Sequence, residues 1–97
     1  MQIIDGKKYN TKTAEQLAKN GWRGQGIYGT QLYVTKKGAF FYLHWSNMQG
    51  EIESIEPTDK VEAFNFYCKH WLMVFDTEAE FEAARLKYFK DVEVVDA

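Results

Sequence analysis

Residues 30–45, TQLYVTKKGAFFYLHW, constrain the fold of this chain more than any other segment. Two runs rich in β-branched and aromatic residues, 32–35 and 39–45, flank the turn-forming residues 36–38, and this arrangement predicts a β-hairpin. Alternation along the second run gives two faces that are both apolar or aromatic, with Phe41, Leu43 and Trp45 on one and Phe40, Tyr42 and His44 on the other. Either both faces are covered in the fold or one of them is a binding surface.

Two further segments favour strands. Residues 2–10 predict a short hairpin, because Asp5-Gly6 is a strong two-residue turn signal. Residues 51–56, EIESIE, predict a third strand of the central sheet, which Pro57 is expected to end.

The segment between the two hairpins, residues 11–21, predicts a short helix. Thr11 or Thr13 is a suitable N-cap, and Gly21 is a suitable left-handed stop. The apolar stripe of this helix is narrow, so the helix must lie on a larger surface.

Two longer helices are predicted in the C-terminal half. The first covers roughly residues 60–71 after a cap at Thr58 or Asp59, and the second opens at Thr77, which forms a capping box with Glu80. Their apolar stripes are Val61, Phe64, Tyr67, Cys68 and Trp71 in the first, and Phe81, Ala84, Tyr88 and Phe89 in the second. The predicted fold class is α+β, with an N-terminal hairpin, a three-stranded antiparallel meander, one short N-terminal helix and two C-terminal helices on one face.

The 97 residues are enough for one domain, residues 1–97, and a composition that is 45% hydrophobic supports a core without disulfide or metal. The single cysteine, Cys68, cannot form an internal bridge, which suits a reducing cytoplasm. No apolar segment approaches the length of a membrane span. The expected location is therefore the cytoplasm, with no membrane partner.

The net charge of −2 conceals an asymmetry between the two halves of the chain. Residues 1–50 carry seven basic and two acidic side chains, whereas residues 51–97 carry five basic and twelve acidic ones. Such asymmetry indicates either different partners for two surfaces or simply the solubilising charge of helix faces.

The glycines Gly24, Gly26 and Gly29 match the G-x-G-x-x-G spacing of nucleotide-binding loops. That chemistry needs a helix N-terminus after the last glycine, directed at the phosphate. Here a helix is expected before the glycines and a strand after them. The triplet therefore favours a connector over a nucleotide site.

Cysteine and histidine offer little support for a metal or catalytic site. Cys68 and His70 lack the ligand spacing of a zinc site, and Cys68 is expected in the core of its helix. A Cys–His catalytic pair would also need an orienting group and an oxyanion motif, which the sequence does not reveal. No enzymatic activity, cofactor or metal is expected.

Two other patterns leave both a functional and a structural interpretation open. Acidic residues recur along 51–62 and 76–82, where they either engage basic residues of a partner or complement helix dipoles. Lys36 and Lys37, with nearby aromatic residues, either form a platform for single-stranded nucleic acid or belong to an aromatic hairpin core.

The order of segments resembles a group of small bacterial, phage and mobile-element proteins. IDGKKYNTKTAEQLA (4–18) and LYVTKKGAFFYLH (32–44) are similar to their "GK-Y-(D/N)-T-x-T-A" opening and their "LY-x-T-x-x-G-x-(F/W)-F" segment, and GEIESIEP (50–57) is similar too. Some of these proteins resemble anti-CRISPR or related anti-defence proteins. The resemblance covers roughly the first 68 residues and implies no catalytic residue.

The resemblance implies a non-catalytic inhibitor of a bacterial defence nuclease, most simply a CRISPR effector, acting in the cytoplasm of the bacterial host. Such an inhibitor would block target nucleic-acid binding or assembly, and direct nucleic-acid binding is not expected of it. The expected contact residues are Trp22, Arg23, Tyr28 and Trp45 together with the acidic Glu51, Glu53, Glu56, Glu78, Glu80 and Glu82. The alternative is a small nucleic-acid-binding or regulatory protein that uses the basic N-terminal half.

Overall fold

The N-terminal hairpin forms where Asp5-Gly6 predicts it. The structure, a computed structural model, describes residues 2–21, 28–46 and 53–92. In it, strand β1 (Gln2–Ile4) pairs antiparallel with β2 (Lys7–Tyr9). Asp5 and Gly6 have positive φ angles of 50° and 77°, as a tight hairpin turn requires. This prediction is confirmed.

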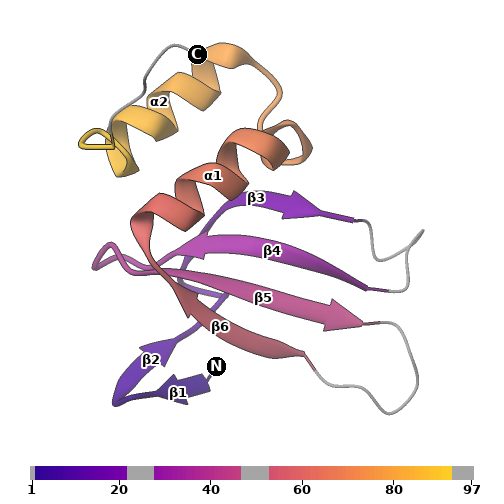
Figure 1. Cartoon of the computed structure of the whole chain (residues 1–97), viewed down its shortest axis with the longest axis vertical. Helices are drawn as coiled ribbons and strands as arrows, with labels where there is room; N and C mark the ends of the chain where they lie inside the picture. Colours follow the sequence, from indigo (N-terminus) through magenta and orange to yellow (C-terminus); the bar gives the residue numbers. More distant parts are fainter. Residues whose placement is uncertain (1, 22–27, 47–52, 93–97) are drawn as a thin grey trace.

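Four further strands form one antiparallel sheet in the order β3-β4-β5-β6 (Figure 1). Their bounds are Glu15–Asn20, Tyr28–Val34, Phe40–Ser46 and Ser54–Thr58. The hairpin predicted within residues 30–45 is confirmed as β4 and β5, joined by a turn in which Gly38 has a φ of 88°. The fold class is α+β as predicted, but the central sheet has four strands where three were expected.

The predicted helix over residues 11–21 is wrong, because the segment forms a turn and then β3. The amide of Ala14 donates to the carbonyl of Asn10 at 3.1 Å, which closes one helical turn that is not continued. The chain then pairs with β4, with a bulge around Leu17. Leu17 and Ala18 are both fully buried, so strand pairing and burial outweigh the local helix signals.

Pro57 lies inside β6 rather than ending it, which corrects a second prediction. β6 is an edge strand that pairs only with β5, and Pro57 stands opposite Phe41 in that pairing. An edge strand has one row of backbone groups without a partner strand, so it tolerates a residue that lacks an N–H.

Both C-terminal helices begin at predicted caps. Helix α1 (Lys60–His70) follows Asp59, whose carboxylate accepts an amide N–H of the first turn at 2.8 Å. Helix α2 (Glu78–Tyr88) follows Thr77, whose hydroxyl likewise accepts an amide N–H at 3.2 Å. A short 3₁₀ helix, η1 (Trp71–Met73), lies between them. The capping residues therefore locate the helix starts correctly.

One face of the sheet is covered by α1, with α2 packed beside α1 (Figure 1). The Phe40 ring of β5 stacks on Phe89, which follows α2, with ring centroids 5.0 Å apart. Tyr67 of α1 is fully buried, and its hydroxyl donates to the carbonyl oxygen of Phe81 at 2.7 Å. The buried residues of this core are Leu17, Ala18, Leu32, Val34, Phe40, Ala63, Tyr67, Ala84 and Phe89.

The opposite face of the sheet is also buried along β5. Phe41 is fully buried between the rings of Tyr9 and Tyr33, whose centroids lie 5.3 and 5.4 Å from its own. Leu43 and Trp45, on the same face, are buried too. The face with Phe41, Leu43 and Trp45 is therefore covered, while on the other face Phe40 is buried and Tyr42 and His44 are half-buried.

The predicted apolar stripe of α1 is only partly correct. Ala63 and Tyr67 are its fully buried residues, whereas Val61 is 61% exposed and Cys68 is exposed. The small Ala63 side chain is buried in the same cluster as the sheet residues, so α1 buries the row through Ala63 and Tyr67. The expectation that Cys68 is a core residue is therefore wrong.

Candidate anion-binding groove

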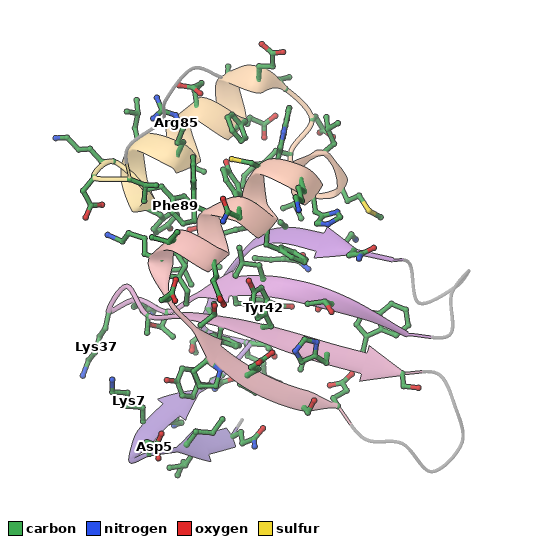
Figure 2. The ribbon with its side chains drawn as sticks, in the orientation of Figure 1. Asp5, Lys7, Lys37, Tyr42, Arg85 and Phe89 are labelled. Carbon is green, nitrogen blue, oxygen red and sulfur yellow. The ribbon has the colours of Figure 1, made fainter. Side chains whose placement is uncertain are left out.

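Two lysine pairs flank turns that lie far apart in the sequence but close together in the fold. Lys7 and Lys8 form the start of β2, and Lys36 and Lys37 lie in the β4–β5 turn. Tyr9, only 5% exposed, packs edge-on against Phe41 and so holds the small hairpin against the sheet. Lys7 and Lys37 consequently lie on facing sides of a gap between the hairpin and the β4–β5 turn (Figure 2).

This region contains an open hollow of about 710 Å³, which we call the lysine groove. Its lining combines the four lysines with small polar residues, namely Gly6, Lys7, Lys8, Tyr9, Asn10, Thr13, Thr35, Lys36, Lys37 and Ala39. No acidic residue is among these lining residues. The groove therefore concentrates positive charge in a concave surface, a shape that focuses the field toward an anion.

Local hydrogen bonds fix the polar walls of the lysine groove. The Thr35 hydroxyl accepts the amide N–H of Ala39 at 3.0 Å, which closes the β4–β5 turn. On the other side, the Asn10 carboxamide oxygen accepts the amide N–H of Lys12 at 3.0 Å. Both hydrogen bonds join a side chain to the nearby backbone, so the lysine side chains extend from backbone segments that these bonds hold in place.

A second hollow of about 550 Å³ adjoins the lysine groove and shares Thr13, Thr35 and Lys36 with it. Its remaining lining residues are Ala14, Glu15, Val34, Lys87 and Tyr88. The Tyr88 hydroxyl donates to the Glu15 carboxylate, and Lys87 Nζ lies 4.0 Å from Glu15 Oε2. Partial burial and the bond to Glu15 both raise the pKa of Tyr88, so its hydroxyl keeps its proton at neutral pH.

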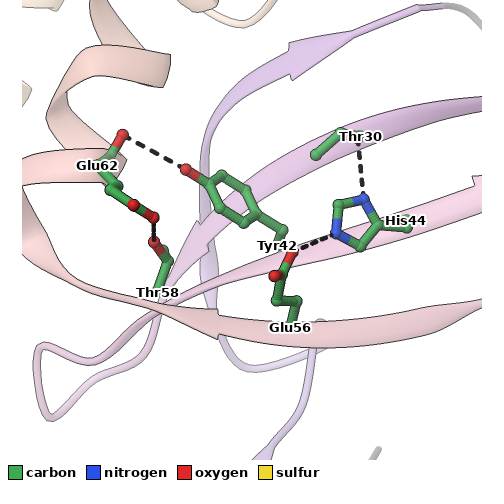
Figure 3. A network of polar contacts seen from close by, with 6 residues as sticks. All are labelled: Thr30, Tyr42, His44, Glu56, Thr58 and Glu62. Carbon is green, nitrogen blue, oxygen red and sulfur yellow. Dashed lines mark hydrogen bonds and ion pairs between the residues drawn. The ribbon is translucent and has the colours of Figure 1, made fainter.

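A third polar arrangement lies on the helix-facing side of the sheet, where side chains of β4, β5 and β6 form a chain (Figure 3). His44 Nδ1 lies 3.0 Å from the Thr30 hydroxyl, and His44 Nε2 lies 2.8 Å from Glu56 Oε1. Next to it, the Tyr42 hydroxyl donates to the Glu62 carbonyl oxygen at 3.4 Å, and desolvation by burial raises the pKa of Tyr42.

Hydroxyl, imidazole and carboxylate in series are the components of a proton relay, in which both ring nitrogens have partners, as those of His44 do. The three side chains come from neighbouring strands, and His44 pairs with Thr30 across the β4–β5 ladder. The arrangement therefore joins three strands on a polar part of the sheet.

The structure separates the acidic residues that the sequence offered as one contact surface. Glu53 lies directly before β6 and Glu56 lies within it; both are exposed, and Glu56 pairs with His44. Glu78, Glu80 and Glu82 are exposed on α2. Figure 1 shows α1 between β6 and α2. On α2, the Glu80 carboxylate accepts a hydrogen bond from the hydroxyl of the N-cap residue Thr77, and the Glu82 carboxylate pairs with the Arg85 guanidinium at 2.8 Å. These local roles match the structural interpretation of the acidic runs.

The predicted aromatic contact residues have different outcomes. Trp45 is only 2% exposed, so in this structure it is a core side chain rather than a surface anchor, because the sheet face on which it lies is buried. Tyr28 begins β4. Trp22, Arg23 and Glu51 lie outside the described residues.

The cysteine and the histidine of α1 have different surroundings in the structure. Cys68 is exposed at the level of the whole residue, yet neighbouring groups desolvate its sulfur and raise the pKa of the thiol. The His70 ring packs against Phe66 with centroids 4.6 Å apart. Among the described residues, no group of three or more histidine, cysteine, aspartate or glutamate side chains could hold a metal ion.

Lys7 and Lys8 are the site residues that sequence reasoning missed. A signal was present, because each hairpin carries a lysine pair directly beside its turn glycine, in DGKK (5–8) and in KKG (36–38). Recognising it required knowing that the two turns lie on the same side of the molecule.

Compared with known protein families, with curated proteins and with solved structures, the chain matches none of them. Within the described residues, no helix is long and apolar enough to cross a membrane.

Proposed function

We propose that this protein is a non-catalytic binding protein that holds the phosphate backbone of a nucleic acid in the lysine groove. The observation that carries the proposal is the gathering of Lys7, Lys8, Lys36 and Lys37 around one hollow that no acidic residue lines. Lysine ammonium groups bind phosphate as point charges, and several of them in a row suit a backbone better than a single small anion.

The local charge matters more here than the net charge of −2. The exposed carboxylates of Glu78, Glu80 and Glu82 lie in the first half of α2, whereas it is the last turn of α2 that adjoins the lysine groove, so they oppose the groove only through screened interactions. The groove offers no exposed aromatic ring among its lining residues, since Tyr9 is buried. Binding by the lysines alone is therefore expected to be weak in sequence preference and strongly dependent on salt.

The test is fluorescence anisotropy of a labelled DNA or RNA with the full chain at several salt concentrations. Contacts from all four lysines to duplex phosphates give a slope of log K against log salt of about −3 to −4. The K36A/K37A variant should lose affinity and lower the magnitude of this slope by about 2. Its matched control is K69A/K90A, which removes the same charge from exposed lysines outside both hollows.

Equal loss of affinity in the two double variants would contradict the proposal, because it would show attraction by overall charge rather than by the groove. Failure of the unaltered protein to bind DNA and RNA at low salt would also contradict it. Circular dichroism of each variant separates a loss of binding from a loss of folding.

We also propose a second function, inhibition of a bacterial defence nuclease, which rests on the resemblance of residues 4–18 and 32–44 to small phage and mobile-element proteins. The exposed carboxylates of Glu78, Glu80 and Glu82 on α2 favour it, since they could face a basic surface of a nuclease.

The two functions separate in one experiment. An inhibitor should lower the activity of a purified CRISPR effector with a stoichiometric endpoint, and E78Q/E80Q/E82Q should weaken this effect while K36A/K37A does not. The nucleic-acid proposal expects the opposite pattern, with inhibition only where the protein competes for the nucleic acid itself.

A further inference from the structure

The second hollow differs from the lysine groove because it contains a carboxylate. Glu15, at the start of β3, lines its wall together with Tyr88, from the last turn of α2. The side chain of Glu15 is 48% exposed, so a ligand in the hollow can reach it. The shared residues Thr13, Thr35 and Lys36 make this hollow a continuation of the groove.

The contacts of Glu15 hold its carboxylate in place through one of its two oxygens. The Tyr88 hydroxyl donates to Oε2, and Lys87 Nζ lies 4.0 Å from the same oxygen. A carboxylate has about four acceptor positions, and the contacts found for Glu15 in the described part of the chain all involve Oε2. Oε1 and a remaining lone pair of Oε2 can therefore accept two hydrogen bonds from adjacent donors of one ligand.

The charges around Glu15 also suit a ligand that carries phosphate close to a hydrogen-bond donor edge. Lys36 belongs to both hollows, and Lys87 lies beside Glu15, so two ammonium groups offset one carboxylate. A nearby phosphate is consequently attracted rather than repelled, while the carboxylate still selects for N–H donors.

We infer that the second hollow receives a guanine base of a single-stranded nucleic acid, with Glu15 accepting hydrogen bonds from the guanine N1–H and N2 amino group. The inference rests on the proposed function, because the phosphates of the same strand lie in the lysine groove. A duplex is excluded as the ligand of this hollow, since base pairing already uses both guanine donors.

The other bases fit Glu15 less well. Adenine and cytosine each place an amino group next to a ring nitrogen acceptor, which would face a carboxylate oxygen. Thymine and uracil have one N–H between two carbonyl groups. Guanine alone among the common bases presents two adjacent donors, so the preference follows from donor count and not from the size of the hollow.

The test uses fluorescently labelled oligothymidylate, either unmodified or carrying one central deoxyguanosine or deoxyinosine, and measures anisotropy with the full chain at low salt. The deoxyguanosine oligonucleotide should bind at least about fivefold more tightly than the unmodified one, which is the least that a good bidentate contact provides. Deoxyinosine lacks the N2 amino group and should lose most of this gain.

Variants of the protein give a second readout. E15Q should abolish the preference for deoxyguanosine without weakening the binding of unmodified oligothymidylate, because the lysine groove is intact. E78Q removes one exposed carboxylate outside the hollow and should preserve the preference. The deoxyinosine comparison needs no variant, so it stands even if E15Q folds poorly.

The outcomes distinguish this inference from the function on which it rests. Equal affinities for the three oligonucleotides, with K36A/K37A still weakening all of them, would overturn the guanine inference and leave the lysine groove as the binding site. No binding of any oligonucleotide would overturn both.

Discussion

The indole ring of Trp45 lies against Gly29, its partner in the β4–β5 ladder. A Cβ atom on residue 29 would lie 2.5 Å from Cζ2 of Trp45 and even closer to the carbonyl oxygen of Asn20. Gly29, the last glycine of the G-x-G-x-x-G match, is therefore required by strand packing. An aromatic side chain covering a glycine on the neighbouring strand is a known way of pinning sheet register.

This packing predicts that G29A is strongly destabilising. The added methyl group must displace either the Trp45 ring or the backbone of β3, so we expect a loss of about 1–3 kcal/mol in the free energy of unfolding, measured with urea. G38A is the comparison, since Gly38 has open space around it and its substitution costs only the strain of a positive φ. A G29A variant as stable as the unaltered protein would show that Trp45 does not occupy this position.

Tyr67 gives a second prediction, because its hydroxyl is fully buried and donates to the Phe81 carbonyl oxygen. Y67F should lower the free energy of unfolding by about 1 kcal/mol. Y33F is a suitable control, since the Tyr33 hydroxyl bonds to the half-buried Gln31 side chain and should matter less.

The same residue predicts alkaline sensitivity. Burial raises the pKa of Tyr67 in the folded state above the value of about 10 that it has in the unfolded chain. The stabilisation is therefore complete below pH 10 and is lost as the pH rises above it, since the unfolded chain releases the proton first. The unaltered protein should lose stability above pH 10 more steeply than Y67F, as urea unfolding at several pH values would reveal. Parallel curves for the two proteins would contradict the assignment.

Cys68 gives a prediction about reactivity. Its thiol is exposed, but desolvation raises its pKa while the Arg85 charge lowers it. Removing that charge in R85Q should raise the pKa further and slow iodoacetamide alkylation at pH 8 by about two- to fivefold, as expected for the loss of an exposed charge. K69A is the control, and an equal slowing in both variants would point to general surface charge instead.

His44 gives a prediction about the edge of the sheet. H44A removes both the contact with Thr30 and the contact with Glu56, so β6 loses a side-chain link to the rest of the sheet. We expect a destabilisation of about 1–2 kcal/mol and faster hydrogen exchange at β6 amides than in β3. E56Q retains an acceptor oxygen and should have the smaller effect. Uniform acceleration across all strands would indicate global unfolding rather than a local link.

The glycine triplet lies between two strands. A helix was expected before the glycines, but β3 lies there. The strand expected after them is present as β4, which contains Gly29 and places no helix N-terminus at that end of the triplet. Gly24 and Gly26 lie outside the described residues.

Local residue patterns account for the features that depend on neighbours a few residues away. The turn at Asp5-Gly6, the β4–β5 hairpin, and the helix caps at Asp59 and Thr77 all follow from local hydrogen bonds and backbone preferences. These interactions join residues close together in the sequence and need no distant partner, so residue patterns predict them well.

Long-range packing determines which surfaces of the protein meet. Residues 15–20 prefer a helix locally but form a strand. They do so because they pair with the edge of β4 and bury Leu17 and Ala18 in the core. Lys7 and Lys37 came together because Tyr9 docks on Phe41, a contact between distant parts of the chain. The candidate binding site depends on such long-range packing: the sequence shows the two lysine pairs, but not that their turns lie on the same side of the molecule.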